Sequence, residues 1–198
     1  RGADVLSYAT GSYPAAMPVL TATYIGFVNQ DTAASLDVPV SLSASASAST
    51  NVGMYAITAS GATDANYSIT FEPGTLTVTK AVLTIRAEDK TKVFGVSMPT
   101  LTASYTGFVE GDTVTDLDSP VVLSTVAAVL SNVGAYSITA SGASDVNYTI
   151  VFEPGTLTVT KAPLTIQAED KNQVYGAALP GFTASYTGFV NGDTAASL

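Results

Sequence analysis

Four carboxylates lie close together in one stretch of the sequence and are the residues best suited to chemistry: Glu110, Asp112, Asp116 and Asp118. Ca²⁺ takes hard oxygen ligands of this kind in proteins, so the four form a candidate calcium site. The matching stretch earlier in the chain keeps only Asp31 and Asp37, and an ordinary solvated acidic loop explains these residues as well. The sequence therefore allows Ca²⁺ as a cofactor without requiring it.

Two residue types that most enzymes use are missing. The chain contains no histidine and no cysteine. It therefore lacks the usual neutral-pH base and the thiol nucleophile, and no glycine-rich phosphate loop precedes a helix. Disulfides and Cys/His zinc sites are excluded as well. We expect no enzymatic activity and no catalytic residues.

The charge balance narrows the range of partners. The chain has 16 acidic and 7 basic residues, a net charge of −9, and such a surface repels nucleic acid and anionic lipid. No run of apolar residues is long enough for a membrane span. Apolar residues nevertheless make up 46% of the chain, which is enough to build hydrophobic cores.

A repeat with a period of 81 residues organises the sequence. The segment NVGMYAITASGATDANYSITFEPGTLTVTKA at 51–81 returns as NVGAYSITASGASDVNYTIVFEPGTLTVTKA at 132–162, without a gap. A third copy begins near its end, where FTASYTGFVNGDT at 182–194 matches LTASYTGFVEGDT at 101–113. A strict period of this kind indicates tandem units of one fold.

The repeat predicts three domains. We expect repeat unit 1 at 1–80 with a divergent start, repeat unit 2 at 81–161, and a partial repeat unit 3 at 162–198. Half a unit cannot bury its apolar face, so we expect the third unit to be completed by further chain or by another chain.

Each unit reads as all-β. Leu83, Ile85 and Ala87 alternate with polar residues, as half-buried strands require, and turn signals such as Glu153-Pro154-Gly155 separate the strands. Six or seven short strands predict a small immunoglobulin-like β-sandwich. The alternative is a β-grasp-like unit with one short helix at 111–117, capped by Asp112 or Thr113.

The junction between units carries no linker. TLTVTKAVLTIRAE at 75–88 contains neither glycine nor proline, so the last strand of one unit runs into the first strand of the next. The buried positions change from even (Leu76, Val78) to odd (Leu83, Ile85), which hands the chain from one core to another. So short a connection predicts a stiff rod.

The sequence resembles the MBG domain of the YGX type, a repeat of bacterial surface adhesins. The residues that carry the resemblance are LTIRAEDKTKVFG at 83–95, with the pair Phe94-Gly95, and VYG ending at Tyr175-Gly176. Repeat unit 1 departs from the family pattern, because it has Tyr13-Pro14 in place of the aromatic-glycine pair. The resemblance implies long, secreted or surface-attached proteins of many units, without enzymatic activity.

Several repeated residues have both an ordinary and a functional interpretation. Lys80 and Lys161 are strand-end lysines or candidates for isopeptide crosslinks, and Asn66 and Asn147 are turn residues or glycosylation sites. Core packing explains the recurring aromatic residues better than a carbohydrate-binding shelf does: Tyr24, Phe27, Tyr105, Phe108, Tyr186 and Phe189. Calcium clamps near the junctions are a further candidate role for four acidic residues: Glu88, Asp89, Glu169 and Asp170.

Three functions remain open. The first is a structural repeat segment of an extracellular adhesin stalk or surface filament, with neighbouring repeats as its partners. The second is an adhesive module that binds host or matrix glycan or mucin through repeated weak sites. The third is a fibre subunit that forms a homopolymer by strand complementation. All three predict a secreted or cell-surface protein.

Overall fold

A computed structural model describes residues 8–12, 17–47 and 49–198. Contacts divide these residues into two compact units, called unit 1 and unit 2 from here on, whose bounds differ from those of the three sequence repeats. Unit 1 takes in the described part of Arg1–Thr84 together with Tyr105–Pro120 and Gly142–Val151. Unit 2 consists of Ile85–Ser104, Val121–Ser141 and Phe152–Leu198. Each unit therefore combines residues of successive sequence repeats.

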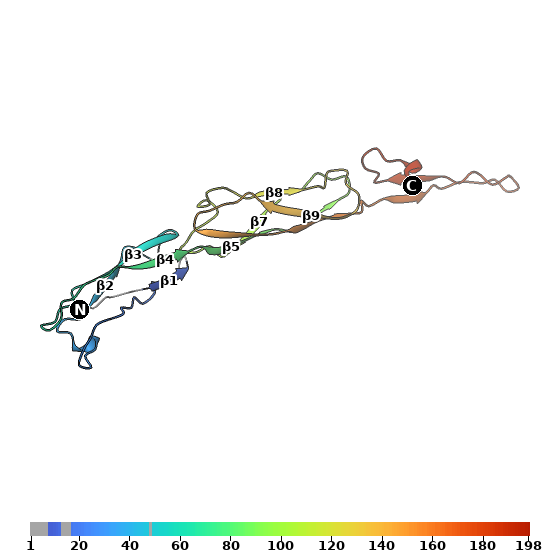
Figure 1. Ribbon diagram of the computed structural model, residues 1–198. Coiled ribbons are helices and arrows are strands. Elements are labelled where there is room, and N and C mark those ends of the chain that lie inside the picture. Colours follow the sequence, from blue (N-terminus) through green and yellow to red (C-terminus); the bar gives the residue numbers. More distant parts are fainter. Residues whose placement is uncertain (1–7, 13–16, 48) are drawn as a thin grey trace. The chain divides into compact units, whose positions relative to one another are not determined.

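Unit 1 contains a four-stranded mixed sheet, seen near the N-terminus in Figure 1. The strand order is β1-β4-β3-β2, with β1 parallel to β4 and the other pairs antiparallel. The strands are β1 (Tyr8–Ser12), β2 (Ser41–Ala44), β3 (Gly53–Ser60) and β4 (Gly74–Thr79). Ile57 on β3 and Leu76 on β4 are almost fully buried, as their alternation with polar neighbours predicts.

Unit 2 repeats this sheet with the residues of the second repeat. Its order is β6-β11-β9-β8, again with one parallel pair, β6 with β11, followed by antiparallel pairs. The strands are β6 (Lys90–Val93), β8 (Val122–Thr125), β9 (Gly134–Ser141) and β11 (Gly155–Thr160).

A three-stranded sheet has the order β10-β5-β7, with β5 in the middle. Its strands are β5 (Ala81–Ala87), β7 (Ala103–Thr106) and β10 (Tyr148–Glu153). The alternation predicted for β5 is confirmed, because Leu83, Ile85 and Ala87 are all fully buried. β4 ends at Thr79 and β5 begins at Ala81, so the prediction that one strand runs into the next is confirmed too.

The core of unit 2 lies between two sheets. Ala87 of β5 packs with Ile138 of β9 and Leu157 of β11, and Met98 and Leu123 are among the partly buried residues around them. Faces of apolar residues from two sheets enclose this core, as in a sandwich. The fold is therefore all-β with sheet-on-sheet packing, and the immunoglobulin-like arrangement remains a prediction.

The helix that a β-grasp-like unit would need is absent from the described residues. The stretches DTAASL form only single turns of 3-10 helix, η1 (Ala33–Ser35) and η2 (Ala195–Ser197), with no buried residue. Thr32 and Thr194 cap these turns, while the matching Thr113 begins a hydrogen-bonded turn that ends at Asp116. A three-residue turn without an apolar face cannot cover a sheet.

The third repeat contributes β12 (Thr165–Ala168) and β13 (Ala184–Thr187), an antiparallel pair within unit 2. These strands correspond to β5 and β7 of the second repeat, yet their burial differs. Ile166 is 55% exposed, whereas its counterpart Ile85 is fully buried. In this pair of strands the apolar face is left largely uncovered.

Candidate functional site: the junctions between repeats

The four carboxylates of the candidate calcium site have separate protein partners. Asp112 accepts a hydrogen bond of 2.7 Å from the hydroxyl of Tyr148, and Asp116 accepts bonds of 2.7 and 2.9 Å from the main-chain N–H and the hydroxyl of Thr113. Glu110 lies in a turn with φ of 55°. Over residues 8–12, 17–47 and 49–198 no group of three acidic residues is arranged to hold a metal ion. Asp112 and Asp116 thus have separate protein partners, and a calcium site at Glu110, Asp112, Asp116 and Asp118 stays a prediction.

The hydrogen bonds to Asp116 also affect its protonation. The main-chain N–H of Thr113, and then its hydroxyl, hold the pKa of Asp116 below the usual 3.8, because both donors stabilise the charged carboxylate. By accepting these two bonds from Thr113, Asp116 closes the turn at 113–116, where the sequence predicted a short helix.

The acidic residues proposed as calcium clamps also accept hydrogen bonds from protein groups. In unit 2, Glu88 accepts hydrogen bonds from the hydroxyl of Thr102 and, at 3.1 Å, from the ammonium of Lys90. These two partners lower the pKa of Glu88, in that order of importance. Asp89 accepts the main-chain N–H of Thr156 at 2.7 Å. Both acids therefore tie β-strand segments of unit 2 together.

The third repeat shows the same acid arrangement. Hydrogen bonds from Thr183, and then from Lys171, hold the pKa of Glu169 below its usual 4.5. The matching behaviour of Glu88 and Glu169 shows that this contact recurs in the second and third repeats.

A tyrosine, an aspartate and a main-chain N–H form a contact that recurs in the first two repeats. The hydroxyl of Tyr67 donates to Asp31 at 2.6 Å and accepts the N–H of Val28 at 3.0 Å. One period later, the hydroxyl of Tyr148 donates to Asp112 and accepts the N–H of Val109 at 3.1 Å. We call this arrangement the tyrosine site of each repeat.

Aromatic stacking completes the tyrosine site. Phe27 meets Tyr67 edge to face at 5.4 Å, and Phe108 meets Tyr148 in the same way at 5.8 Å. Tyr24 stacks on Phe27, and Tyr105 stacks on Phe108. The recurring aromatic residues thus pack on one another, as sequence reasoning preferred over a carbohydrate-binding shelf.

Asn147 joins the second repeat to the first within unit 1. Its side-chain oxygen accepts the N–H of Val52 at 3.0 Å, and its side-chain nitrogen donates to the side-chain oxygen of Asn51 at 3.1 Å. Its main-chain oxygen also accepts the N–H of Ala81. The side-chain nitrogen of Asn147 is therefore engaged and its side chain is half-buried, whereas Asn66 is exposed.

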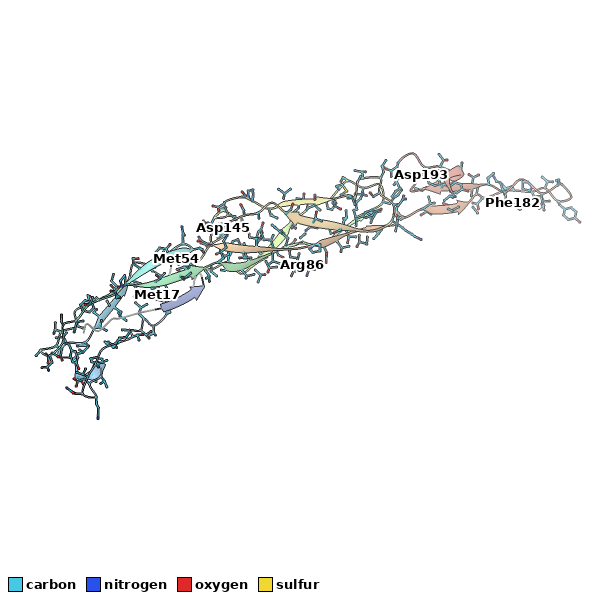
Figure 2. All side chains as sticks on the ribbon, in the orientation of Figure 1. Met17, Met54, Arg86, Asp145, Phe182 and Asp193 are labelled. Atoms are coloured by element: carbon cyan, nitrogen blue, oxygen red, sulfur yellow. The ribbon has the colours of Figure 1, made fainter. Side chains whose placement is uncertain are left out.

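Lys80 is the single residue between β4 and β5, and it reaches the same loop. Its ammonium donates to the main-chain oxygens of Asp145 at 3.2 Å and Tyr148 at 3.5 Å. Asp145 lies in the turn that precedes β10, where Figure 2 labels it. Lys80 thus binds main-chain carbonyls through hydrogen bonds, as the interpretation of a strand-end lysine without an isopeptide crosslink predicts.

Unit 2 contains the corresponding junction between the second and third repeats. Phe94 donates its N–H to the oxygen of Thr160 at 2.8 Å, next to the end of β11. Gly95 follows with φ of 80°, and a Cβ built there would lie 2.9 Å from Cβ of Val190. The aromatic-glycine pair of one repeat therefore approaches the next repeat closely, a contact that the sequence pattern did not reveal.

Sequence reasoning also missed Lys92, the buried charged residue of the described core. It is only 5% exposed, and its ammonium donates to the oxygens of Ala128 at 3.2 Å and Val129 at 2.7 Å. These carbonyls satisfy the charge inside unit 2. Residues 90–92 are Lys-Thr-Lys, a run of three polar residues, so the sequence gives no sign that Lys92 is buried.

The MBG domain (YGX type) family profile matches residues 3–77, 83–158 and 164–198. No curated protein matches the chain. The divergent Tyr13-Pro14 of the first repeat lies outside the described residues. In the part of the chain that the structure describes, no helix has the length and apolar character needed to cross a membrane.

Proposed function

Because the chain belongs to the MBG domain (YGX type) family, we propose that it is a segment of an extracellular adhesin stalk or surface filament that carries a distal function away from the cell. The family is a structural repeat type, and its units are present here in tandem. Neighbouring repeats of the same chain are accordingly the partners of each unit.

The observation that supports the proposal most directly is the joint within unit 1. Asn147 bonds to Val52 and to Asn51, Lys80 bonds to the loop before β10, and one residue separates β4 from β5. A joint with so many fixed points leaves little freedom between the first two repeats. A repeat that serves to extend a chain needs a joint of this kind.

Spin-label distance measurement tests the proposed stiffness. The chain has no cysteine, so Val19→Cys and Thr106→Cys, one in each of the first two repeats, give a uniquely labelled pair. We expect a narrow distance distribution that widens clearly when Asn147→Ala and Lys80→Ala are combined. Ser43→Ala, on a β2 residue away from the joint, is the control and leaves the distribution unchanged. A broad distribution in the unaltered chain would contradict the structural role.

Ligand binding by each unit is the weaker alternative. A glycan-binding shelf needs exposed aromatic faces, whereas Phe27 and Phe108 are half-buried and each contacts two tyrosine rings. The surface location is part of the proposal, and antibodies against the chain that label intact source cells are its test. Absence of label on intact cells, with label after lysis, would contradict it.

A further inference from the structure

β8 is the last strand of the four-stranded sheet in unit 2 and lies next to β9 (Figure 1). The matching strand of the first repeat, β2, is likewise the last strand of its sheet, although the second repeat follows it in the chain. The open edge therefore occurs in both four-stranded sheets. Such an edge presents main-chain N–H and C=O groups with which a further strand can pair.

The exposed side chains along β8 and the loop after it include three large aliphatic ones. Val122 on β8 is 57% exposed, and Val126 and Leu130 in the loop are 88% and 63% exposed. Exposed and half-buried residues alternate from 122 to 128, so the side chains of Val122 and Val126 project on the same side.

The first repeat exposes the same three positions but fills them with serine. The counterparts of the aliphatic residues are Ser41, Ser45 and Ser49, and all three are exposed. Exposure at these positions therefore belongs to the repeat itself. The second repeat differs from the first in placing aliphatic side chains there.

The loop between β8 and β9 is held in place from inside unit 2. The ammonium of Lys92 donates to the main-chain oxygens of Ala128 and Val129, and Ala127 packs against the core. The hydroxyl of Ser131 accepts the N–H of Ala128 at 2.8 Å. The aliphatic residues of the loop thus belong to an ordered surface, which loses less free energy on binding than a mobile one.

Charge indicates which partner this edge fits. No acidic or basic residue occurs from Ser119 to Ser144, although the whole chain has a net charge of −9. A partner recognised by its charge finds nothing to pair with here, whereas two copies of this acidic chain can approach each other at an uncharged edge. Natural edge strands commonly carry charges that prevent such pairing, and β8 carries none.

The edge is also complementary to itself. When two copies of one strand run antiparallel about a two-fold axis, a single surface serves both copies, because each contact is made twice. The aliphatic side chains of each copy then cover those of the other. Such an arrangement closes at two copies and cannot continue into a fibre.

We propose that the edge of β8, with Val122, Val126 and Leu130, is an interface at which two copies of this chain pair antiparallel as a closed dimer. Each copy keeps all its own strands, and neither fills a gap in the other. The inference goes beyond the proposed structural role and does not depend on it.

Sedimentation equilibrium of the unaltered full chain measures the association. We expect a reversible dimer, at twice the mass of one chain, whose fraction rises with concentration. Because one strand edge buries less area than a standard interface, the dimer should be weak and need high protein concentration. Val122→Ser, Val126→Ser and Leu130→Ser together, which restore the residues of the first repeat, should raise the dissociation constant about tenfold or more.

Two lysine substitutions distinguish edge pairing from stacking of sheet faces. Ser124→Lys places a charge on the exposed side of β8, where two like charges meet in the dimer, and should abolish association. Ser137→Lys places the same charge on the same face one strand further in, on β9, and should leave association unchanged. Val82→Ser removes a 60% exposed aliphatic residue of β5 and is the control for a general loss of apolar surface.

Three results would overturn the proposal. The first is a chain that stays monomeric up to millimolar concentration, and the second is association that neither the triple serine variant nor Ser124→Lys weakens. The third is equal weakening by Ser137→Lys, which would show that sheet faces dock instead of edges. The serine variant keeps the test valid if Ser124→Lys disturbs unit 2, since serine already occupies the same exposed positions in the first repeat.

Discussion

Single side chains in this protein hold loops to strands by charge-assisted hydrogen bonds. Asp31, Asp112, Asp116 and Glu88 each accept bonds from a hydroxyl group of the protein. Such bonds are shorter and stronger than neutral ones. An acidic chain with few basic residues can therefore use its carboxylates as structural acceptors, with little dependence on ion pairs.

The tyrosine site predicts a dependence of stability on pH. The bond to Asp31, the largest cause, raises the pKa of Tyr67 above 10.0 in the folded chain. Stability from this hydroxyl is therefore fully present below pH 10 and is lost as the pH rises through the folded value. We expect the unaltered chain to be more stable than Tyr67→Phe at pH 8, with the difference shrinking above pH 10, as measured by urea unfolding. A difference that grows with pH would contradict this assignment.

At the scale of the element, the glycine of the aromatic-glycine pair determines how closely successive repeats approach. Gly95 and Gly176 have nearly equal φ, 80° and 82°. Only Gly95 has a neighbour, Val190, within contact distance of a built Cβ, whereas the space at Gly176 is open. A comparison of Gly95 with Gly176 therefore distinguishes the effect of backbone strain, which both share, from the effect of packing, which only Gly95 has.

Alanine at these two positions gives a matched prediction. Both substitutions should cost about 1–2 kcal/mol, because alanine is strained at positive φ. Gly95→Ala should cost about 1–3 kcal/mol more, since its methyl group overpacks against Val190. Denaturant unfolding of the two variants measures the difference. Equal losses would show that the contact between Gly95 and Val190 carries no weight.

The positions and buried faces of the strands could be predicted from the sequence, but the pairing of strands far apart in the chain could not. Alternation placed Leu83, Ile85 and Ala87 on the buried face of one strand, because side-chain direction in a strand has a period of two. The absence of glycine and proline from 75–88 predicted the strand-to-strand junction. The parallel pairing of β6 with β11 has no such local signal, because it depends on residues far apart in the chain.

The candidate calcium residues show a different limit of sequence reasoning. Asp112 faces Tyr148 and Asp116 faces Thr113, while shared ligation of Ca²⁺ by these residues stays a prediction. A hydroxyl 36 residues away competes for the carboxylate, and nothing in the local sequence records this partner. The repeat itself held the missing signal, since Asp31 and Tyr67 recur one period later as Asp112 and Tyr148.

Over the whole molecule, equal sequences have unequal surroundings. Leu83 and Ile85 are fully buried, while Ile166 is 55% exposed in a nearly identical segment. An isolated pair of strands is marginally stable in water, so the difference in covering layers should appear in local stability.

Hydrogen exchange measures this difference. The amides of β5 should exchange only through large-scale unfolding, and those of β12 through local opening with a free energy close to zero. Because β5 and β12 share Thr-Ile, at 84–85 and 165–166, the intrinsic exchange rates there are nearly matched. Similar protection of β5 and β12 would contradict the prediction.

The parallel pairing of β6 with β11 has a mechanical consequence. β6 lies near the beginning of the second repeat and β11 at its end, and four register pairs join them from Leu157–Lys90 to Thr160–Val93. When tension is applied to the chain on either side of this repeat, it loads these bonds in shear, so that they must break together and not one after another. Resistance to pulling is thus concentrated in one short ladder within the repeat.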